Sequence, residues 1–95
     1  MEVKNSAQAG TFESSDILVM IEPVDKGSGI TIDLSSSVYM HYADSIKTTI
    51  TRVLNSFEIK DVKIIAKDKG ALDAIIEARV ETALKRALGI QQGTL

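Results

Sequence analysis

The alternation of apolar and polar residues predicts three strands along the chain. The first, residues 16–22, is a β-branched apolar run that Pro23 ends. The second, residues 30–34, has apolar side chains at every second position, as expected of a half-buried strand. The third, residues 62–66, repeats this alternation, with Ile65 as the one exception.

Two amphipathic helices are predicted from apolar residues that recur at three- and four-residue steps. The first pattern runs from Val38 to Phe57, and the second runs from Ala71 to Leu88. The serines at 35–37 are candidate N-cap residues for the first helix, and Asp68 is a candidate cap at the start of the second. Gly89 is expected to end the second helix.

The resulting order, ββαβα, predicts an α+β two-layer sandwich of the split-βαβ type. A short glycine-containing link separates the first two strands, so we expect them to pair as a hairpin. The expected sheet is three-stranded and antiparallel in the order 2-1-3, with both helices on one face. The predicted organisation is a flexible N-terminal segment over residues 1–10, a single domain over residues 11–90 and a frayed C-terminus over residues 91–95.

Composition narrows the range of functions. The chain of 95 residues has a net charge of −2 with its basic residues dispersed, which argues against nucleic acid as a partner. It has no cysteine, so its own side chains supply no disulfide, thiolate metal ligand or thiol nucleophile. No apolar stretch approaches the roughly 18–20 residues of a membrane span, and the N-terminus lacks the apolar core of a signal peptide. We therefore expect a cytoplasmic protein without a membrane partner.

The search for catalytic groups centres on the one histidine, His41. Tyr42 is its neighbour and Asp44 follows three residues on, but no convincing nucleophile completes the group. One histidine and scattered carboxylates do not form a zinc site either. We expect no catalytic residue and no metal site. Residues 68–73 open a helix whose free amides would suit an anion, although a capped helix start is the simpler interpretation.

Ser14 and Ser15 lie between Glu13 and Asp16, directly before the first strand. One interpretation is a polar turn in which Ser15 or Asp16 bonds nearby backbone. The other is a serine that an external enzyme modifies, since the site joins an accessible segment to a stiff strand. In the second interpretation, Glu13 and Asp16 would orient the modifying enzyme, or they would repel the phosphates of an attached group from the protein surface.

Four short motifs in the same order resemble the acyl carrier protein, or gamma subunit, of citrate lyase. They are GTFESSD at 10–16, LSSSV at 34–38, IKTTI at 46–50 and DKGALD at 68–73 with Arg79 beyond it. The resemblance covers about residues 5–90. It implies that Ser14 carries a 2'-(5''-phosphoribosyl)-3'-dephospho-CoA group through a phosphodiester. Ser15 is the second choice, because many members of the family have glycine at this position.

The resemblance also implies a non-catalytic carrier subunit of a lyase complex. The thiol of its prosthetic group would shuttle acetyl and citryl thioesters between the alpha (acyl-transferase) and beta (citryl lyase) subunits while citrate is cleaved to oxaloacetate and acetate. A dedicated prosthetic-group transferase would be a third partner. A relative that acts on another hydroxy acid, such as citramalate, remains open. The fold class is also compatible with a non-catalytic regulatory or interaction module, and with an RNA-binding split-βαβ domain, which the scarce aromatic residues disfavour.

Overall fold

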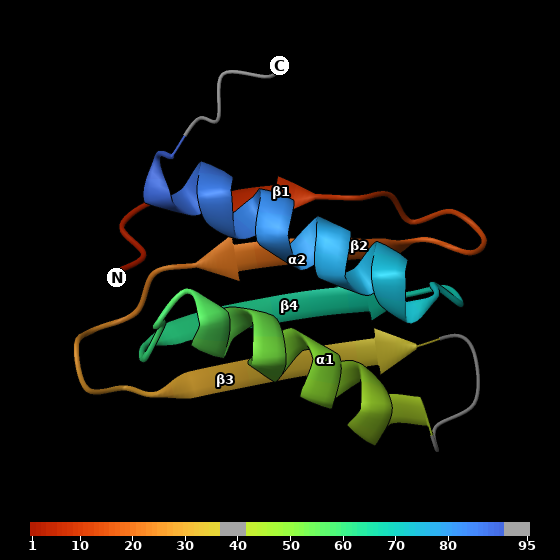
Figure 1. The fold of residues 1–95 in the computed structure, drawn as a ribbon, viewed down its shortest axis with the longest axis horizontal. Coiled ribbons are helices and arrows are strands. Elements are labelled where there is room, and N and C mark those ends of the chain that lie inside the picture. The colour runs from red at the N-terminus through yellow and green to blue at the C-terminus, as the bar shows by residue number, and fades with distance from the viewer. Residues whose placement is uncertain (37–41, 91–95) are drawn as a thin grey trace.

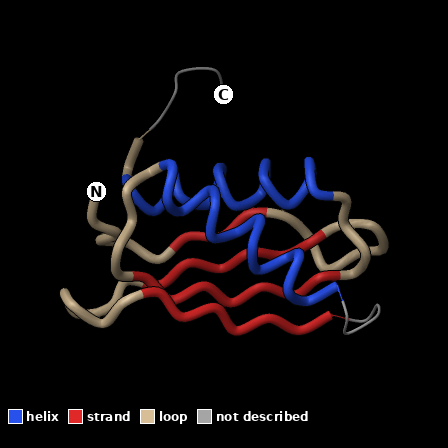
Figure 2. Tube along the Cα trace, turned by 60° about the horizontal axis from the view of Figure 1, so that its bottom comes forward, coloured by secondary structure: helices blue, strands red, loops and turns tan. Residues whose placement is uncertain are grey.

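The computed structural model describes residues 1–36 and 42–90, which form four strands and two helices (Figure 1). In chain order these are β1 (Ala7–Ala9), β2 (Ile17–Glu22), β3 (Ile30–Ser36), α1 (Ala43–Ser56), β4 (Val62–Asp68) and α2 (Asp73–Leu88). The strands form one sheet in the order β1-β2-β4-β3. Both helices cover the same face of that sheet (Figure 2). The predicted α+β two-layer architecture with two helices on one face is therefore confirmed.

The predicted strand order is wrong, because β4 lies between β2 and β3. β2 pairs antiparallel with β4 as predicted, whereas β3 pairs parallel with β4 along its whole length, from Ile30 opposite Val62 to Ser36 opposite Asp68. β2 and β3 are antiparallel to each other but are not neighbours. The link between them therefore spans two strand spacings of about 4.8 Å each, which is well within the reach of residues 23–29. The sheet is mixed rather than antiparallel.

The sheet also has a fourth strand that the hydrophobic pattern did not predict. β1 pairs antiparallel with β2, with Ala9 opposite Val19, and lies within the segment expected to be flexible. Val3 is buried as well, at 7% exposure. Residues 3–9 therefore belong to the folded body. The run Ala-Gln-Ala has neither the β-branched residues nor the length that would mark it as a strand.

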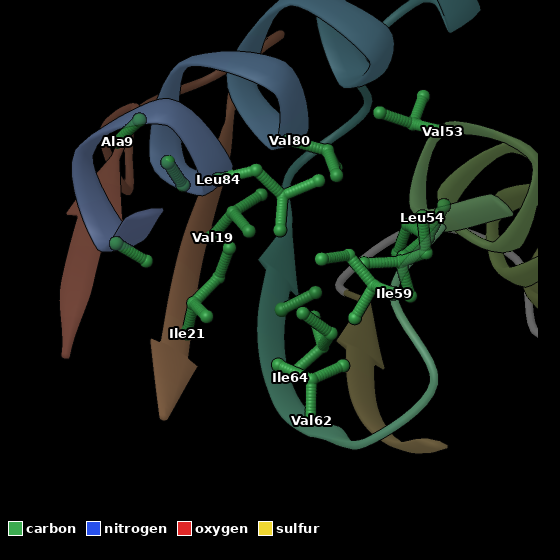
Figure 3. Packing of buried hydrophobic residues seen from close by; sticks show 14 of the residues in the cluster. Ala9, Val19, Ile21, Val53, Leu54, Ile59, Val62, Ile64, Val80 and Leu84 are labelled. Carbon is green, nitrogen blue, oxygen red and sulfur yellow. The ribbon is translucent and has the colours of Figure 1, made fainter. Parts of the chain in front are cut away.

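Aliphatic side chains fill the space between the sheet and the helices (Figure 3). Alternate residues of β2 and β4, including Val19, Ile21 and Ile64, are fully buried and face the helices. Leu54 of α1 and Leu84 of α2 meet them from the other layer. Within the described residues, no helix has the length and apolar character that a bilayer crossing requires.

The helix boundaries correct two predicted caps and confirm the third. Ser35 and Ser36 do not cap α1, because β3 continues through Ser36 to remain paired with β4; Ser37 lies outside the described residues. Asp68 lies five residues before α2 and does not bond to the first turn of that helix. Gly89 does end α2, with a φ of 72° and its amide bonded to Arg86. This is the left-handed terminus that glycine adopts without strain.

Replacing Ile64 with alanine is expected to lower the free energy of unfolding by about 2–5 kcal/mol, because the side chain is fully buried on a central strand. Urea unfolding followed by circular dichroism measures this difference. The matched control is Ile30→Ala on edge strand β3, where the side chain is 36% exposed and the cost is expected to be much smaller. Equal costs at the two positions would contradict the observed strand order.

Candidate functional site

Residues 10–16 form the loop that joins β1 to β2, and this loop lies at one end of the sheet. β4 ends at the same end, and both helices begin there (Figure 1). The opposite end holds the N-terminus and the link between β2 and β3 (Figure 1). The Ser14–Ser15 pair therefore lies beside the segment that joins β4 to α2, which is distant from it in the sequence.

The two serines occupy the corner of a tight turn. The Asp16 amide donates a hydrogen bond to the Glu13 carbonyl at 3.1 Å, which closes a four-residue β-turn. Ser15, at the third position, has a φ of 65°, as a type II turn requires there. Glycine adopts this conformation freely, whereas another residue typically loses about 1 kcal/mol. The turn therefore requires the left-handed backbone conformation of Ser15.

Backbone hydrogen bonds attach this turn to the segment after β4. The Ser15 amide donates to the Lys69 carbonyl at 2.8 Å, and the Lys69 amide donates to the Asp16 carbonyl at 2.9 Å. These two bonds extend the antiparallel pairing of β2 with β4 beyond its last residue pair, Ile17 with Asp68. The turn is thus a continuation of the sheet.

The carboxylate of Asp16 connects the loop to α2. Both of its oxygens accept hydrogen bonds from Arg79, at 3.0 Å from Nε and 3.2 Å from Nη2. The same carboxylate accepts bonds from the Thr11 hydroxyl at 2.7 Å and the Ile17 amide at 2.7 Å. A bidentate arginine–carboxylate pair of this kind fixes direction as well as distance. One side chain therefore joins the two ends of the loop and the second helix.

These contacts favour the ionised form of Asp16. They lower its pKa from 3.8 to about 2, with the Arg79 hydrogen bond as the largest cause, against a smaller opposing effect of burial. Asp16 thus has a structural role, and its carboxylate is turned toward Thr11 and Arg79. The hypothesis that Asp16 repels phosphates or orients a modifying enzyme does not fit this position.

Gly10 begins the loop at a point where a side chain has no space. Its φ is +92°, and a Cβ atom there would lie 1.9 Å from the Ile17 carbonyl oxygen and 3.3 Å from Cδ of Arg79. The glycine allows the Arg79 side chain to pass the loop and reach Asp16. The motif of Gly10, Asp16 and Arg79 is therefore one structural unit.

Ser14 occupies the outer corner of the turn. Both serines are exposed, and within residues 1–36 and 42–90 neither hydroxyl has a hydrogen-bond partner. Of the two serines, only Ser15 helps to hold the turn, through its backbone amide bond to Lys69. The polar-turn and modified-serine interpretations are therefore compatible, because the turn uses Ser15 and leaves Ser14 open to solvent.

Asp68 stabilises the neighbouring segment and does not act as a helix cap. Its carboxylate, which is almost fully buried, accepts bonds from the amides of Gly70 and Ala71 and from the Ser36 hydroxyl. Two of the amides considered for an anion at 68–73 are thus already bonded by a carboxylate. Within the described part of the chain, no group of three or more histidine, cysteine or acidic residues is suited to a metal ion. His41 lies outside the described residues.

The chain is similar to known proteins along most of its length. The family model described as "ACP: Malonate decarboxylase delta subunit (MdcD)" matches residues 4–87. A citrate lyase acyl carrier protein from Edwardsiella ictaluri is 41% identical over 87 residues, which cover 92% of this chain and 88% of that protein. One from Treponema denticola is 48% identical over 87 residues, which cover 92% of this chain and 97% of that protein.

A chain in the crystal structure of a Pseudomonas malonate decarboxylase hetero-tetramer in complex with malonate has the same fold. Its TM-score is 0.75 at 21% sequence identity, and the match covers 92% of this chain and 88% of that one. At this identity the likeness concerns the fold alone. The overall fold of this chain is therefore shared with a solved structure.

An exposed serine on a hydrogen-bonded turn suits the class of acyl carrier proteins. Members of this class hold acyl groups on a covalently attached prosthetic group. The family match and the identities above show that the chain belongs to the acyl carrier family described by the matching model, and the two relatives named here are citrate lyase acyl carrier proteins. The resemblance inferred from the four motifs is confirmed.

Asp16→Asn is expected to lower the free energy of unfolding at neutral pH but not in strong acid. Because the folded-state pKa of Asp16, about 2, is below its ordinary value of 3.8, its contribution is complete above about pH 5 and disappears as the pH falls through 3.8 toward 2. We expect a loss on the order of 1–2 kcal/mol near pH 6, which allows for the solvent exposure of Arg79. Urea titrations at several pH values measure it.

The control for this titration is Asp33→Asn, an exposed carboxylate on β3 for which the structure has no ion pair within the described residues. Its difference from the wild type is expected to be small at every pH. If the stability difference between Asp16→Asn and the wild type stayed constant from pH 6 to pH 2, the Arg79 contact would not be the cause.

Proposed function

We propose that this protein is the acyl carrier subunit of citrate lyase and that Ser14 is the residue to which its prosthetic group is attached. The observation that carries the assignment is the position of Ser14 at the exposed corner of an anchored turn. A transferase needs an accessible hydroxyl, and a carrier needs an attachment point that keeps a constant position on the folded body. Ser14 meets both requirements, whereas the backbone of Ser15 holds the turn together.

The residues of the turn fit a group attached through a phosphodiester. The Ser14 hydroxyl is exposed and has no partner among the described residues, so its modification breaks no hydrogen bond of the fold. We assign the group as 2'-(5''-phosphoribosyl)-3'-dephospho-CoA, in keeping with the sequence motifs. When attached, this group supplies the thiol that holds acyl groups as thioesters. The chain has no cysteine of its own, so no second thiol competes for the acyl group.

The partners in this proposal are the citrate lyase alpha and beta subunits and the prosthetic-group transferase, all in the cytoplasm. The carrier presents its group to one active site after the other while remaining bound to the complex. A short flexible tether keeps its end at an effective concentration on the order of millimolar. The rigid turn fixes where the tether begins, and the carrier domain itself needs no catalytic residue.

The proposal predicts that one prosthetic group is attached to each chain and that its attachment requires Ser14. The protein is co-expressed with the enzymes that synthesise and transfer the group, and its intact mass is measured for the wild type, Ser14→Ala and Ser15→Gly. We expect the added mass in the wild type and in Ser15→Gly but not in Ser14→Ala. Ser15→Gly should also be at least as stable as the wild type, since glycine adopts a φ of 65° without strain.

Two controls make the mass measurement decisive. Circular dichroism of Ser14→Ala checks that the variant is folded, and a known citrate lyase acyl carrier protein checks that the transferase is active. Loss of the mass in Ser15→Gly but not in Ser14→Ala would move the attachment to Ser15. No added mass in the wild type, with an active transferase, would overturn the carrier assignment and favour a non-covalent interaction module.

A further inference from the structure

Phe12 is a large apolar side chain exposed beside the proposed attachment site. It lies two residues before Ser14 and is 56% exposed, and it does not belong to the hydrophobic core cluster. The loop does not need this ring for its own structure, because the Asp16 carboxylate and the backbone bonds to Lys69 already hold it. An exposed aromatic ring next to a modified residue suggests a surface for part of the attached group.

Two lysines surround this ring. The Lys69 Nζ atom is 4.8 Å from the centre of the Phe12 ring, and the Lys67 Nζ atom is 6.0 Å from it. Both distances are within the range of cation–π contacts. Neither ammonium forms an ion pair with a carboxylate in the part of the chain that the structure describes. Both remain available to an anionic group without the loss of an existing salt bridge.

The sheet directs these lysines to the side of the molecule that the helices leave open. Ala66 and Asp68 are buried on the helix side of β4, so Lys67 between them faces the opposite side. Its neighbours across the sheet are Leu18 on β2 and Ser35 on β3. The ring and the two ammonium groups therefore form one surface, which we call the Phe12 platform: Phe12, Lys67 and Lys69.

The local charge is complementary to phosphates. Asp16 and Arg79 neutralise each other, and the buried Asp68 carboxylate is bonded by the amides of Gly70 and Ala71 and the Ser36 hydroxyl. Within residues 11–16 and 67–69, the accessible charges without an ion pair are therefore the two lysines of the platform and the carboxylate of Glu13. The attached group has a phosphodiester at its serine end and a pyrophosphate beyond its adenosine. Nucleotides commonly bind at surfaces that combine an aromatic ring for the base with cations for the phosphates.

We propose that the Phe12 platform binds the nucleotide portion of the attached prosthetic group, with the adenine against the ring of Phe12 and the phosphates beside Lys67 and Lys69. This inference rests on the proposed function and adds a second, non-covalent contact to it. The serine end of the group is held on the protein surface, and the pantetheine end with its thiol remains free to move. The platform thus shortens the mobile part of the arm and directs where it leaves the carrier.

The test uses the loaded protein, after its mass has shown that the group is attached. The first measurement is a nuclear Overhauser experiment on the loaded wild type, which detects protons that lie close together in space. We expect cross-peaks between the adenine protons and the ring of Phe12. Their absence, in protein that carries the full added mass, would overturn the platform and leave the carrier assignment intact. Absence of the mass itself would contradict the proposed function instead.

The second measurement follows the hydrolysis of the pyrophosphate of the arm by a nucleotide pyrophosphatase. Binding at the platform is expected to protect this bond, so Phe12→Leu and the double variant Lys67→Gln, Lys69→Gln should both be cleaved faster, by about tenfold if stacking contributes its usual share. Free dephospho-CoA in the same reaction calibrates the enzyme. Added salt should speed the cleavage of the wild type more than that of the double lysine variant.

The matched control removes two lysines elsewhere. Lys47 on α1 and Lys60 before β4 are also exposed, so Lys47→Gln, Lys60→Gln has the same net charge as the platform variant. It should be cleaved at the wild-type rate. Equal acceleration in both double variants would show a general charge effect and would overturn the platform. If a platform variant failed to accept the group, the cross-peaks of the wild type would decide the question alone.

Discussion

The bond between Asp16 and Arg79 is the contact on which the geometry of the site depends. It joins residues 63 positions apart and connects the loop before β2 to the middle of α2. Gly10 leaves space for the Arg79 side chain, and Thr11 and Ile17 donate further hydrogen bonds to the Asp16 carboxylate. A loop of this length is otherwise free to sample many conformations. Because the ionised Asp16 side chain bonds both Thr11 and Arg79, the loop presents the serine turn in a constant orientation relative to both layers of the sandwich.

In the turn, the adjacent residues Ser14 and Ser15 have different roles. The backbone of Ser15 adopts the left-handed conformation and bonds Lys69, whereas Ser14 takes no part in holding the loop. Chemical change at Ser14 therefore has little effect on the fold, and change in the backbone at Ser15 has a direct one. The same separation extends to the acids, since Asp16 is bonded on both of its oxygens and Glu13 is exposed. Residues adjacent in sequence thus belong to different parts of the structure.

Hydrophobic periodicity was sufficient to predict three strands, two helices and their layers, because each has a regular apolar face. It did not predict the strand order, because β2 and β3 run in opposite directions whether or not β4 separates them. β1 has no apolar pattern to detect, and its pairing comes from the edge of β2. The candidate serine was found from its motif, but the partner of Asp16 was not: nothing near Asp16 in the sequence indicates Arg79. A polar contact between residues far apart in the chain produces no periodic pattern in the sequence around either residue.

The chain begins at one end of the sandwich, far from the serine turn (Figure 1). The N-terminus and the end of α2 lie at one end of the molecule, and the serine turn lies at the other (Figure 1). An affinity tag, a fluorescent label or a solid support joined to the start of the chain is thus kept away from Ser14 by the length of the sheet. Immobilised protein would present the Ser14 turn outward, in a uniform direction, to enzymes supplied in solution.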